Sequence, residues 1–233
     1  VWCKTWVIEL NTNKCKTMRV SRTKTNPSQY SLNIVQLESV ASYKYLGIHI
    51  TTNLTWNFHI EHIVNQANCM LGYLHCNFFT APSSLKLLLY KTLVHSKLEY
   101  ACSVWDPCHG KIIALEVVQN NSVRFVLGNY HRTASITRMK SDLALPSLSI
   151  RCQISRLTIF NKLYHHPVLR GELISRPHYQ SSRVDHAPKV GIDMCKTMHC
   201  FHFFLPRTSR DWNRLPFDIA SINDVQQFSK CSS

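Results

Sequence analysis

Paired carboxylates are the feature that this sequence most clearly lacks. Its 233 residues include only 13 Asp and Glu, no two of them are adjacent, and no aspartate precedes Asp106. Nucleotidyl transfer by two divalent ions requires carboxylates that bridge ions about 4 Å apart. Residues 1–54 contain only two acids, Glu9 and Glu38. We therefore predict that this part of the chain cannot hold a two-metal site by itself.

Other signatures of enzymes and of secreted or membrane proteins are missing as well. There is no GxSxG motif, no glycine-rich phosphate loop and no CxxC pair. No apolar run approaches the ~20 residues of a membrane span, and nothing at the start resembles a signal peptide. We expect the ten scattered cysteines to be mostly reduced and buried. Because the chain opens on Val1 within an amphipathic pattern, we also expect a piece of a longer protein, whose targeting signals would not be visible here.

Cysteine and histidine gather in two places, but without the spacing of a metal site. Zinc usually takes four N or S ligands from two close pairs, so we predict no metal site. A zinc-dependent module in the first group is kept as a hypothesis that metal analysis would test. His59 and His62 lack the HExxH pattern, and we expect them on a solvated helix face. The two groups are Cys195, His199, Cys200 and His202, and Cys102, Cys108 and His109.

Positive charge is what the sequence has in excess. The 27 Lys and Arg outnumber the acids enough to give a formal net charge of +14 and a pI of about 9.5. Such an excess attracts polyanions, and nucleic acid is the first partner class to consider, with an anionic membrane surface second. A basic protein without a dedicated partner is the remaining alternative.

Hydrophobic periodicity predicts an α+β chain with a small sheet near its start. Residues 1–10 have helical spacing and Asn11–Asn13 supplies a turn, after which 14–20, 30–37 and 42–50 are predicted strands separated by a basic loop over 21–29. In 42–50 the side chains alternate between two faces. Gly47 interrupts one face, as expected of a bulge or of a place where another backbone approaches closely.

From Trp56 onward the period becomes helical. The pattern predicts helices over 56–78, from a cap at Thr80 to Pro107, and over 112–126, 135–143 and 147–164. Residues 166–198 have the composition of a loop or linker, 201–205 are a predicted strand, and a turn or short helix follows around Trp212. We predict three parts: 1–54, 55–165 and 166–233.

Several motifs in this order resemble the end of the reverse transcriptase domain of non-LTR (LINE-type, jockey-like or CR1-like) retrotransposons. The resemblance covers essentially the whole chain, and its central motifs are specific. The motifs are WVIELNTNKCKTM at 6–18, YKYLGI at 43–48, LTW at 54–56, LEYACSVWDP at 98–107, LEVVQNNSVR at 115–124, FFLPRT at 203–208 and WNRLP at 212–216.

The resemblance implies a fold and a division of labour. Residues 1–54 would be a partial palm, consisting of a helix and a small antiparallel sheet. Residues 55–165 would be a mainly α-helical thumb-like bundle with its extension, and 166–233 a linker and an irregular C-terminal segment. Lys14 would assist the pyrophosphate leaving group. Tyr45, Leu46 and Gly47 would lie in the hairpin called the primer grip, with Gly47 letting a nucleic-acid backbone approach. The nucleic-acid-binding residues would be Lys14, Lys16, Arg19, Tyr45, Leu46, Gly47, Arg124 and Arg151.

The resemblance also implies partners. They would be an RNA template, a DNA primer, and the upstream palm and fingers of the same polyprotein, with no membrane. The location would be the nucleus or a cytoplasmic ribonucleoprotein. The family's catalytic aspartate pair would lie before Trp2, so we expect no cofactor in this chain, Mg²⁺ only in the complete enzyme, and no polymerisation by this chain alone. The alternative is a stand-alone basic nucleic-acid-binding or interaction module built on the helical bundle.

Overall fold

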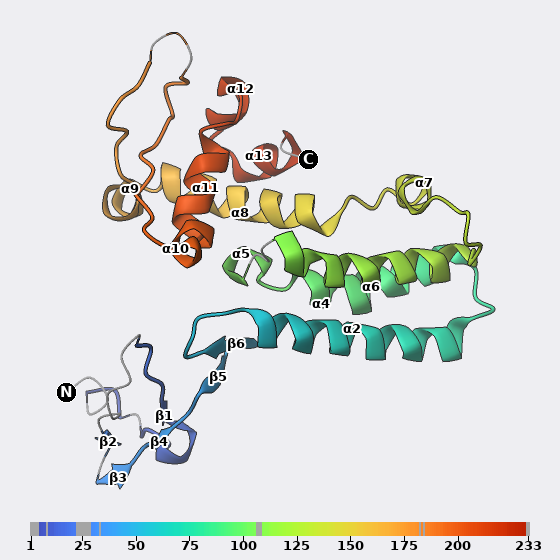
Figure 1. Ribbon diagram of the computed structural model, residues 1–233, viewed down its shortest axis with the longest axis horizontal. Helices are drawn as coiled ribbons and strands as arrows, with labels where there is room; N and C mark the ends of the chain where they lie inside the picture. Colours follow the sequence, from blue (N-terminus) through green and yellow to red (C-terminus); the bar gives the residue numbers. More distant parts are fainter. Residues whose placement is uncertain are drawn as a thin grey trace. The chain divides into compact units, whose positions relative to one another are not determined.

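The computed structural model describes residues 5–7, 9–21, 29–32, 34–105, 109–181, 183 and 185–231, and Figure 1 shows the order of its elements. The chain forms two compact units, Val1–His62 and Ile63–Ser233. The division falls inside one helix, α2 (Asn57–Phe78). Each unit is therefore described by itself.

The described residues of the first unit form three separate two-stranded sheets. One sheet is parallel (β1 with β4) and two are antiparallel (β2 with β3, β5 with β6), so the predicted α+β class is confirmed, whereas the predicted small antiparallel sheet is divided into separate pairs, one of them parallel. The predicted turn over Asn11–Asn13 is confirmed as a 3₁₀ turn in which Asn11 accepts from the Asn13 amide. The elements are η1 (Thr12–Lys14), β1 (Lys16–Thr17), β2 (Ser31–Leu32), β3 (Val35–Gln36), β4 (Glu38–Ser39), β5 (Ser42–Tyr45) and β6 (Ile48–Thr51).

Local backbone geometry explains the other differences from the predicted strands. Residues 30–37 are not one strand, because the chain reverses between Leu32 and Val35, and Ile34 has a φ of +70°. The strand predicted over 14–20 is only two residues long. Of the predicted helix over 1–10, residues 1–4 and 8 lie outside the described part, and the helix does not reach Leu10. Residues 22–28 of the predicted basic loop also lie outside it.

The stretch 42–50 is a hairpin rather than one strand with a bulge. Tyr45 pairs with Ile48, so only Leu46 and Gly47 form the turn between β5 and β6. Their φ angles are +46° and +84°, and positive φ at both positions defines a type I′ turn, whose twist matches that of the strands. Glycine adopts this conformation freely, whereas a leucine is strained there by roughly 1–2 kcal/mol. The turn therefore holds a strained, exposed apolar residue at its tip.

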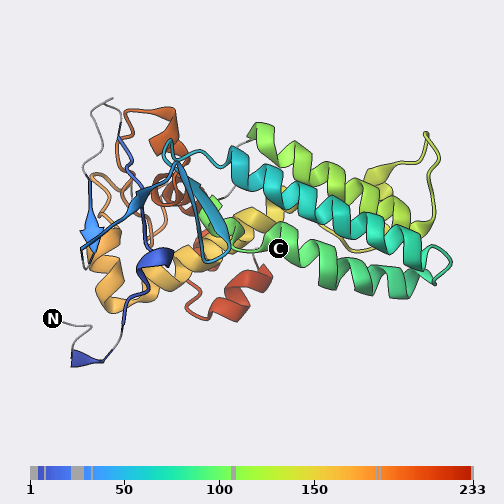
Figure 2. The same ribbon diagram turned by 90° about the horizontal axis from the view of Figure 1, so that it is seen from below.

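Helices make up the second unit, much as the periodicity predicts. The apolar stripe of α2 is confirmed, with Ile63, Ala67, Leu71 and Leu74 buried. From Ile63 onward α2 lies beside the run from α3 to α4 and beside α6 in both views (Figures 1 and 2). The helices are α3 (Ser83–Leu89), the π-helical η2 (Tyr90–His95), α4 (Ser96–Glu99), α5 (Cys102–Trp105), α6 (His109–Leu127), α7 (Ile136–Asp142) and α8 (Leu148–His165).

Their ends follow from capping chemistry. Ser135 and Ser147 cap α7 and α8 by accepting backbone N–H groups with their side chains. Gly128, with a φ of +63°, closes α6 in a Schellman motif, and the Asn129 amide reaches the carbonyl of residue 124 at 3.1 Å. Thr80 is not the cap of α3, because the helix begins after Pro82. The long helix ends at Tyr100 rather than at Pro107, because the next residue has a φ of +52°.

Near the C-terminus, helices replace the start of the predicted linker and the predicted strand, whereas the described residues of 174–197 are irregular, as predicted. Pro167 stands in the first turn of α9, and His166 Nδ1 accepts from the Leu169 amide. The apolar run 201–205 is not a strand: it spans the end of α10, the extended residue Phe203 and the start of α11. The elements are α9 (Pro167–Leu173), α10 (Met198–His202), α11 (Phe204–Trp212), α12 (Phe217–Ala220) and α13 (Val225–Cys231).

The core of this C-terminal region is built around Trp212, which is fully buried. Its ring lies 5.2 Å from those of Phe160 and Tyr164 on α8 and 5.8 Å from that of Phe228 on α13. Its Nε1–H donates to the carbonyl of Pro188 at 3.0 Å. The indole thus connects three helices with the irregular segment that precedes α10.

Cysteines and apolar helices give two further findings on the described residues. The described cysteines are free, but only Cys102 and Cys152 are buried, so the predicted burial is wrong for most of them. In the described part of the chain, none of the helices combines the length and the hydrophobicity that crossing a membrane requires.

Replacing Trp212 by alanine is predicted to destabilise the second unit by about 4 kcal/mol, the usual cost of removing a fully buried tryptophan side chain. Urea unfolding followed by circular dichroism measures the change. The matched control is Trp6→Ala, because Trp6 is 65% exposed, and it should cost less than about 0.5 kcal/mol. Equal effects of the two substitutions would contradict this account of the core.

Candidate nucleic-acid interface

The tip of the β5–β6 hairpin exposes an aromatic and an apolar side chain. Tyr45, the last residue of β5, is 58% exposed, and Leu46, the first residue of the turn, is 72% exposed. At the other end of β5, the Tyr43 hydroxyl donates to the carbonyl of Lys14 at 3.4 Å. This bond ties the turn that carries Lys14 to the hairpin. The first unit thus brings the predicted residues Lys14, Tyr45, Leu46 and Gly47 into one small structure.

Two more predicted cations lie next to this turn. Lys16 on β1 forms an ion pair with Glu38 on β4, across the parallel pair of strands. Arg19 follows β1 and is exposed. A solvent-exposed ion pair of this kind contributes little stability, so a phosphate could replace the Glu38 carboxylate as the partner of Lys16 at small cost.

Three histidines support the base of the hairpin, a feature that sequence analysis missed. His59 is 1% exposed, so its predicted place on a solvated helix face is wrong. Its Nδ1 accepts the backbone N–H of His49 at 3.3 Å and joins the first turn of α2 to β6. The His49 ring lies 4.6 Å from that of His62 and 5.1 Å from that of Phe58. The only hint of this cluster in the sequence was that His49 lies between Ile48 and Ile50 in the alternating pattern of a strand.

Burial lowers the pKa of His59 to about 4, and the neighbouring His49, His62 and Lys44 add to the shift. Burial, with His62 and Lys44 beside it, also lowers the pKa of His49. Both imidazoles are therefore neutral at pH 7, and the neutral form of His59 is the one that can accept the bond from His49.

The free energy of unfolding of the hairpin is predicted to decrease as the pH is lowered. An unfolded histidine binds a proton near pH 6.5, whereas His59 in the fold does so only near pH 4. Stability is thus complete above pH 6.5 and is lost progressively between pH 6.5 and 4, by about 3 kcal/mol. Urea unfolding followed by tryptophan fluorescence at several pH values measures the loss. His59→Asn keeps an acceptor without the titration and should remove most of it, whereas the exposed-loop control His131→Asn should not.

The predicted cations of the second unit lie on different helices and have different partners. Arg151 on α8 forms a bidentate ion pair with Glu99: its Nε donates to Oε1, and its Nη2 donates to Oε2 at 2.8 Å. His95 Nε2 lies 3.1 Å from the other carboxylate oxygen. Burial alone would raise the pKa of Glu99, but hydrogen bonds from His95 and Arg151 hold it at about 2. Arg124 on α6 donates to the carbonyl of His131 at 3.1 Å and so orders the turn after α6.

Some of the acids of the second unit join its elements or stabilise a turn. Glu116 receives Lys140 at 2.6 Å and the first amide of α8, that of Leu148, at 2.7 Å. Asp211 pairs with the buried Arg156, and Asp185 pairs with Lys189 at 2.6 Å. Because Lys and Arg outnumber Asp and Glu by 27 to 13, an excess of cations remains beyond these pairs, which favours binding of a polyanion.

No carboxylate cluster suited to a divalent ion is formed by the residues that the structure describes. Among them, His, Cys, Asp and Glu never gather in a group of three or more that could hold a metal ion. Of the two groups, the side chains of His109 and His199 and residue Cys108 lie outside the described part. The described residues therefore do not fit the Mg²⁺ that a complete reverse transcriptase would use.

Sequence comparison finds relatives of this chain among the RNA-directed DNA polymerases of mobile elements. The polymerase from the mobile element jockey of Drosophila melanogaster is 25% identical over 174 residues, which is 71% of this chain and 18% of that protein. Its Drosophila funebris counterpart is 23% identical over 172 residues, again 71% and 18%. The probable RNA-directed DNA polymerase from transposon X-element of Drosophila melanogaster is 24% identical over 132 residues, 54% of this chain and 14% of that protein.

The predicted resemblance to non-LTR reverse transcriptases is confirmed by these similarities. The matched stretches span only 14% to 18% of the relatives' length. No family model matches the chain, and no solved structure does. The assignment of palm and thumb to the two units therefore stays a prediction.

Proposed function

We propose that this chain is part of an RNA-directed DNA polymerase and contributes binding of the template and primer. The observation that carries the proposal is the similarity to the jockey polymerases over 71% of the chain. The net charge of +14 agrees with a nucleic-acid partner. In this proposal the β5–β6 hairpin contacts the primer, and Arg124 and Arg151 of the second unit contact the duplex.

The hairpin tip has the chemistry that such a contact needs. Tyr45 presents an exposed ring, which can stack on a base or pack against a sugar. Gly47 has no side chain to keep a phosphate backbone away from the turn. Lys14, whose carbonyl is bound by Tyr43, and the nearby Lys16 would neutralise phosphates. Lys14 is also proposed to assist the leaving group once the complete site is assembled.

Binding of an RNA–DNA hybrid tests the proposal. Fluorescence anisotropy with the full chain should show an affinity that falls steeply as the salt concentration rises. Each neutralised phosphate makes the slope of log K against log salt more negative by about 0.9. Tyr45→Ala should weaken binding roughly tenfold by removing one stacking contact. The control is Tyr73→Ala on α2, because Tyr73 is 57% exposed and Tyr45 is 58% exposed.

Either of two results would sink the proposal. One is the absence of binding at low salt, and the other is binding that does not respond to salt. Equal losses for Tyr45→Ala and Tyr73→Ala would remove the hairpin from the interface and leave only the general charge effect.

Primer extension by this chain alone is expected to fail, with Mg²⁺ or with Mn²⁺. The reason is that no two acids are adjacent in the sequence and that the described residues offer no carboxylate cluster. Extension assays on a primed RNA template measure this directly. Incorporation of nucleotides above a no-protein control would show that the metal site is assembled in another way.

A stand-alone nucleic-acid-binding module is the second candidate. It is favoured by the hydrophobic core that the second unit forms around Trp212 without help from the first. Deleting residues 1–54 separates the two candidates. Unchanged affinity for the hybrid would favour the stand-alone module, whereas a loss comparable to that of Tyr45→Ala would favour the template–primer surface.

A further inference from the structure

A cavity in the C-terminal region, far along the chain from the hairpin, is lined by cations. It has a volume of about 600 Å³ and lies among the end of α8, α9 and two stretches of the irregular segment that follows α9. We call residues 174–177 the first arm of that segment and residues 189–191 its second arm. Three of its lining residues are cationic, and among the described residues that line it none is acidic. The cations are Arg170, Arg176 and Lys189.

Arg170 is held in position before any ligand arrives. Its guanidinium carbon lies 4.2 Å from the centre of the Tyr164 ring, and its Nη2 donates to the Tyr164 hydroxyl at 3.1 Å. Tyr164 is itself packed against Trp212. A planar guanidinium fixed on an aromatic ring keeps further N–H groups available, and its fork geometry matches a phosphate.

The two arms of the irregular segment touch, which fixes the other side of the cavity. The Gly191 amide donates to the carbonyl of Ser175 at 2.8 Å. A Cβ atom on Gly191 would lie 2.5 Å from Ser175 Oγ and 2.7 Å from the carbonyl oxygen of Arg176. Because only glycine fits there, the arm that carries Arg176 lies directly against the arm that carries Lys189.

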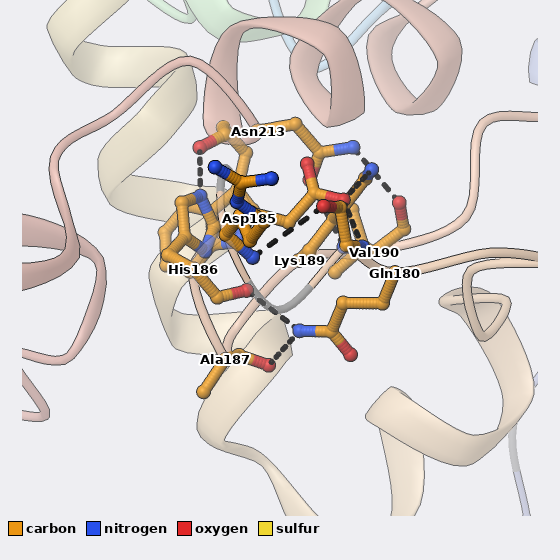
Figure 3. A network of polar contacts seen from close by, with 10 residues as sticks. Gln180, Asp185, His186, Ala187, Lys189, Val190 and Asn213 are labelled. Carbon is orange, nitrogen blue, oxygen red and sulfur yellow. Dashed lines mark hydrogen bonds and ion pairs between the residues drawn. The ribbon is translucent and has the colours of Figure 1, made fainter.

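A network of hydrogen bonds fastens the second arm to the end of α11 (Figure 3). The Asn213 side chain accepts the Val190 amide and donates to the Val190 carbonyl, both at 2.9 Å. Gln180 bonds to the carbonyl of His186 at 2.8 Å. Asp185 pairs with Lys189 and thereby neutralises part of its charge. Arg170 and Arg176 are consequently the two cations best placed to receive an anion.

We infer that this cavity binds a phosphate group of a nucleic-acid backbone, through Arg170 and Arg176. The choice of nucleic acid rests on the proposed function, whereas the binding of a phosphate rests on the cavity alone. The contact would be a second one, made by the region after the helical bundle rather than by the hairpin. Only a backbone contact is proposed, because the one aromatic residue among the described lining residues, Tyr164, already carries the Arg170 guanidinium on its ring and so is not open for stacking on a base.

Two measurements on the full chain test the inference separately. Titration with inorganic phosphate, followed by NMR of the arginine Nε–H signals, should shift those of Arg170 and Arg176 in a saturable way. In anisotropy with the RNA–DNA hybrid, the double variant Arg170→Gln and Arg176→Gln should lower affinity roughly tenfold and the salt slope by about 1. The control Arg138→Gln removes the same kind of charge from exposed α7 and should change affinity less than twofold. Arg176→Gln alone, at an exposed position, should give part of the loss without disturbing the Tyr164 stack.

Each contrary result has a distinct meaning. Absence of the phosphate-induced shifts overturns the site, while salt-dependent hybrid binding that is sensitive to Tyr45→Ala would still support the proposed function. Phosphate-induced shifts without any loss of hybrid affinity overturn the nucleic-acid assignment and leave a site for free phosphate. Losses equal to that of Arg138→Gln overturn the site in favour of a general effect of charge.

Discussion

The burial of Trp212 is the constraint on which the C-terminal half of the protein depends. One indole contacts α8 and α13 through its ring faces, and its N–H binds the carbonyl of Pro188. Backbone groups of an irregular segment need partners that regular elements would otherwise supply. Trp212 and the next residue, Asn213, supply them for Pro188 and Val190. The side chains displayed by that segment therefore owe their positions to the end of α11.

The second unit also uses a small number of acidic side chains to connect its elements. Acids are scarce, and four of those in the second unit serve as joints between elements or within a turn: Glu99, Glu116, Asp185 and Asp211. Cations outnumber them, and several, such as Arg170 on Tyr164, are held by aromatic contacts instead. A fold stabilised in this way keeps a positive surface without needing more acids to stay compact. A positive surface of this kind favours contact with a phosphate backbone.

The sequence predicted the helices best, because a 3.6-residue period and serine caps are local signals. The stripe of α2 and the caps Ser135 and Ser147 are examples. The small sheets were harder, since Leu46 adopts a positive φ that residue type does not suggest. The run at 201–205 was misread as a strand because extended Phe203 separates two helices. The hairpin residues are predicted as a site by family resemblance and stay a prediction, whereas the cavity at Arg170 and Arg176 depends on contacts of Gly191 and Asn213 that no local pattern reveals.

The ion pair between Arg156 and Asp211 has a practical consequence for anyone handling the protein. The Arg156 side chain is 2% exposed and that of Asp211 is 18% exposed, so dissolved ions screen this pair far less than contacts on the surface. Strong salt therefore weakens charge contacts on the exterior, while the joint between α8 and α11 persists. We expect concentrated salt during purification to leave this joint intact.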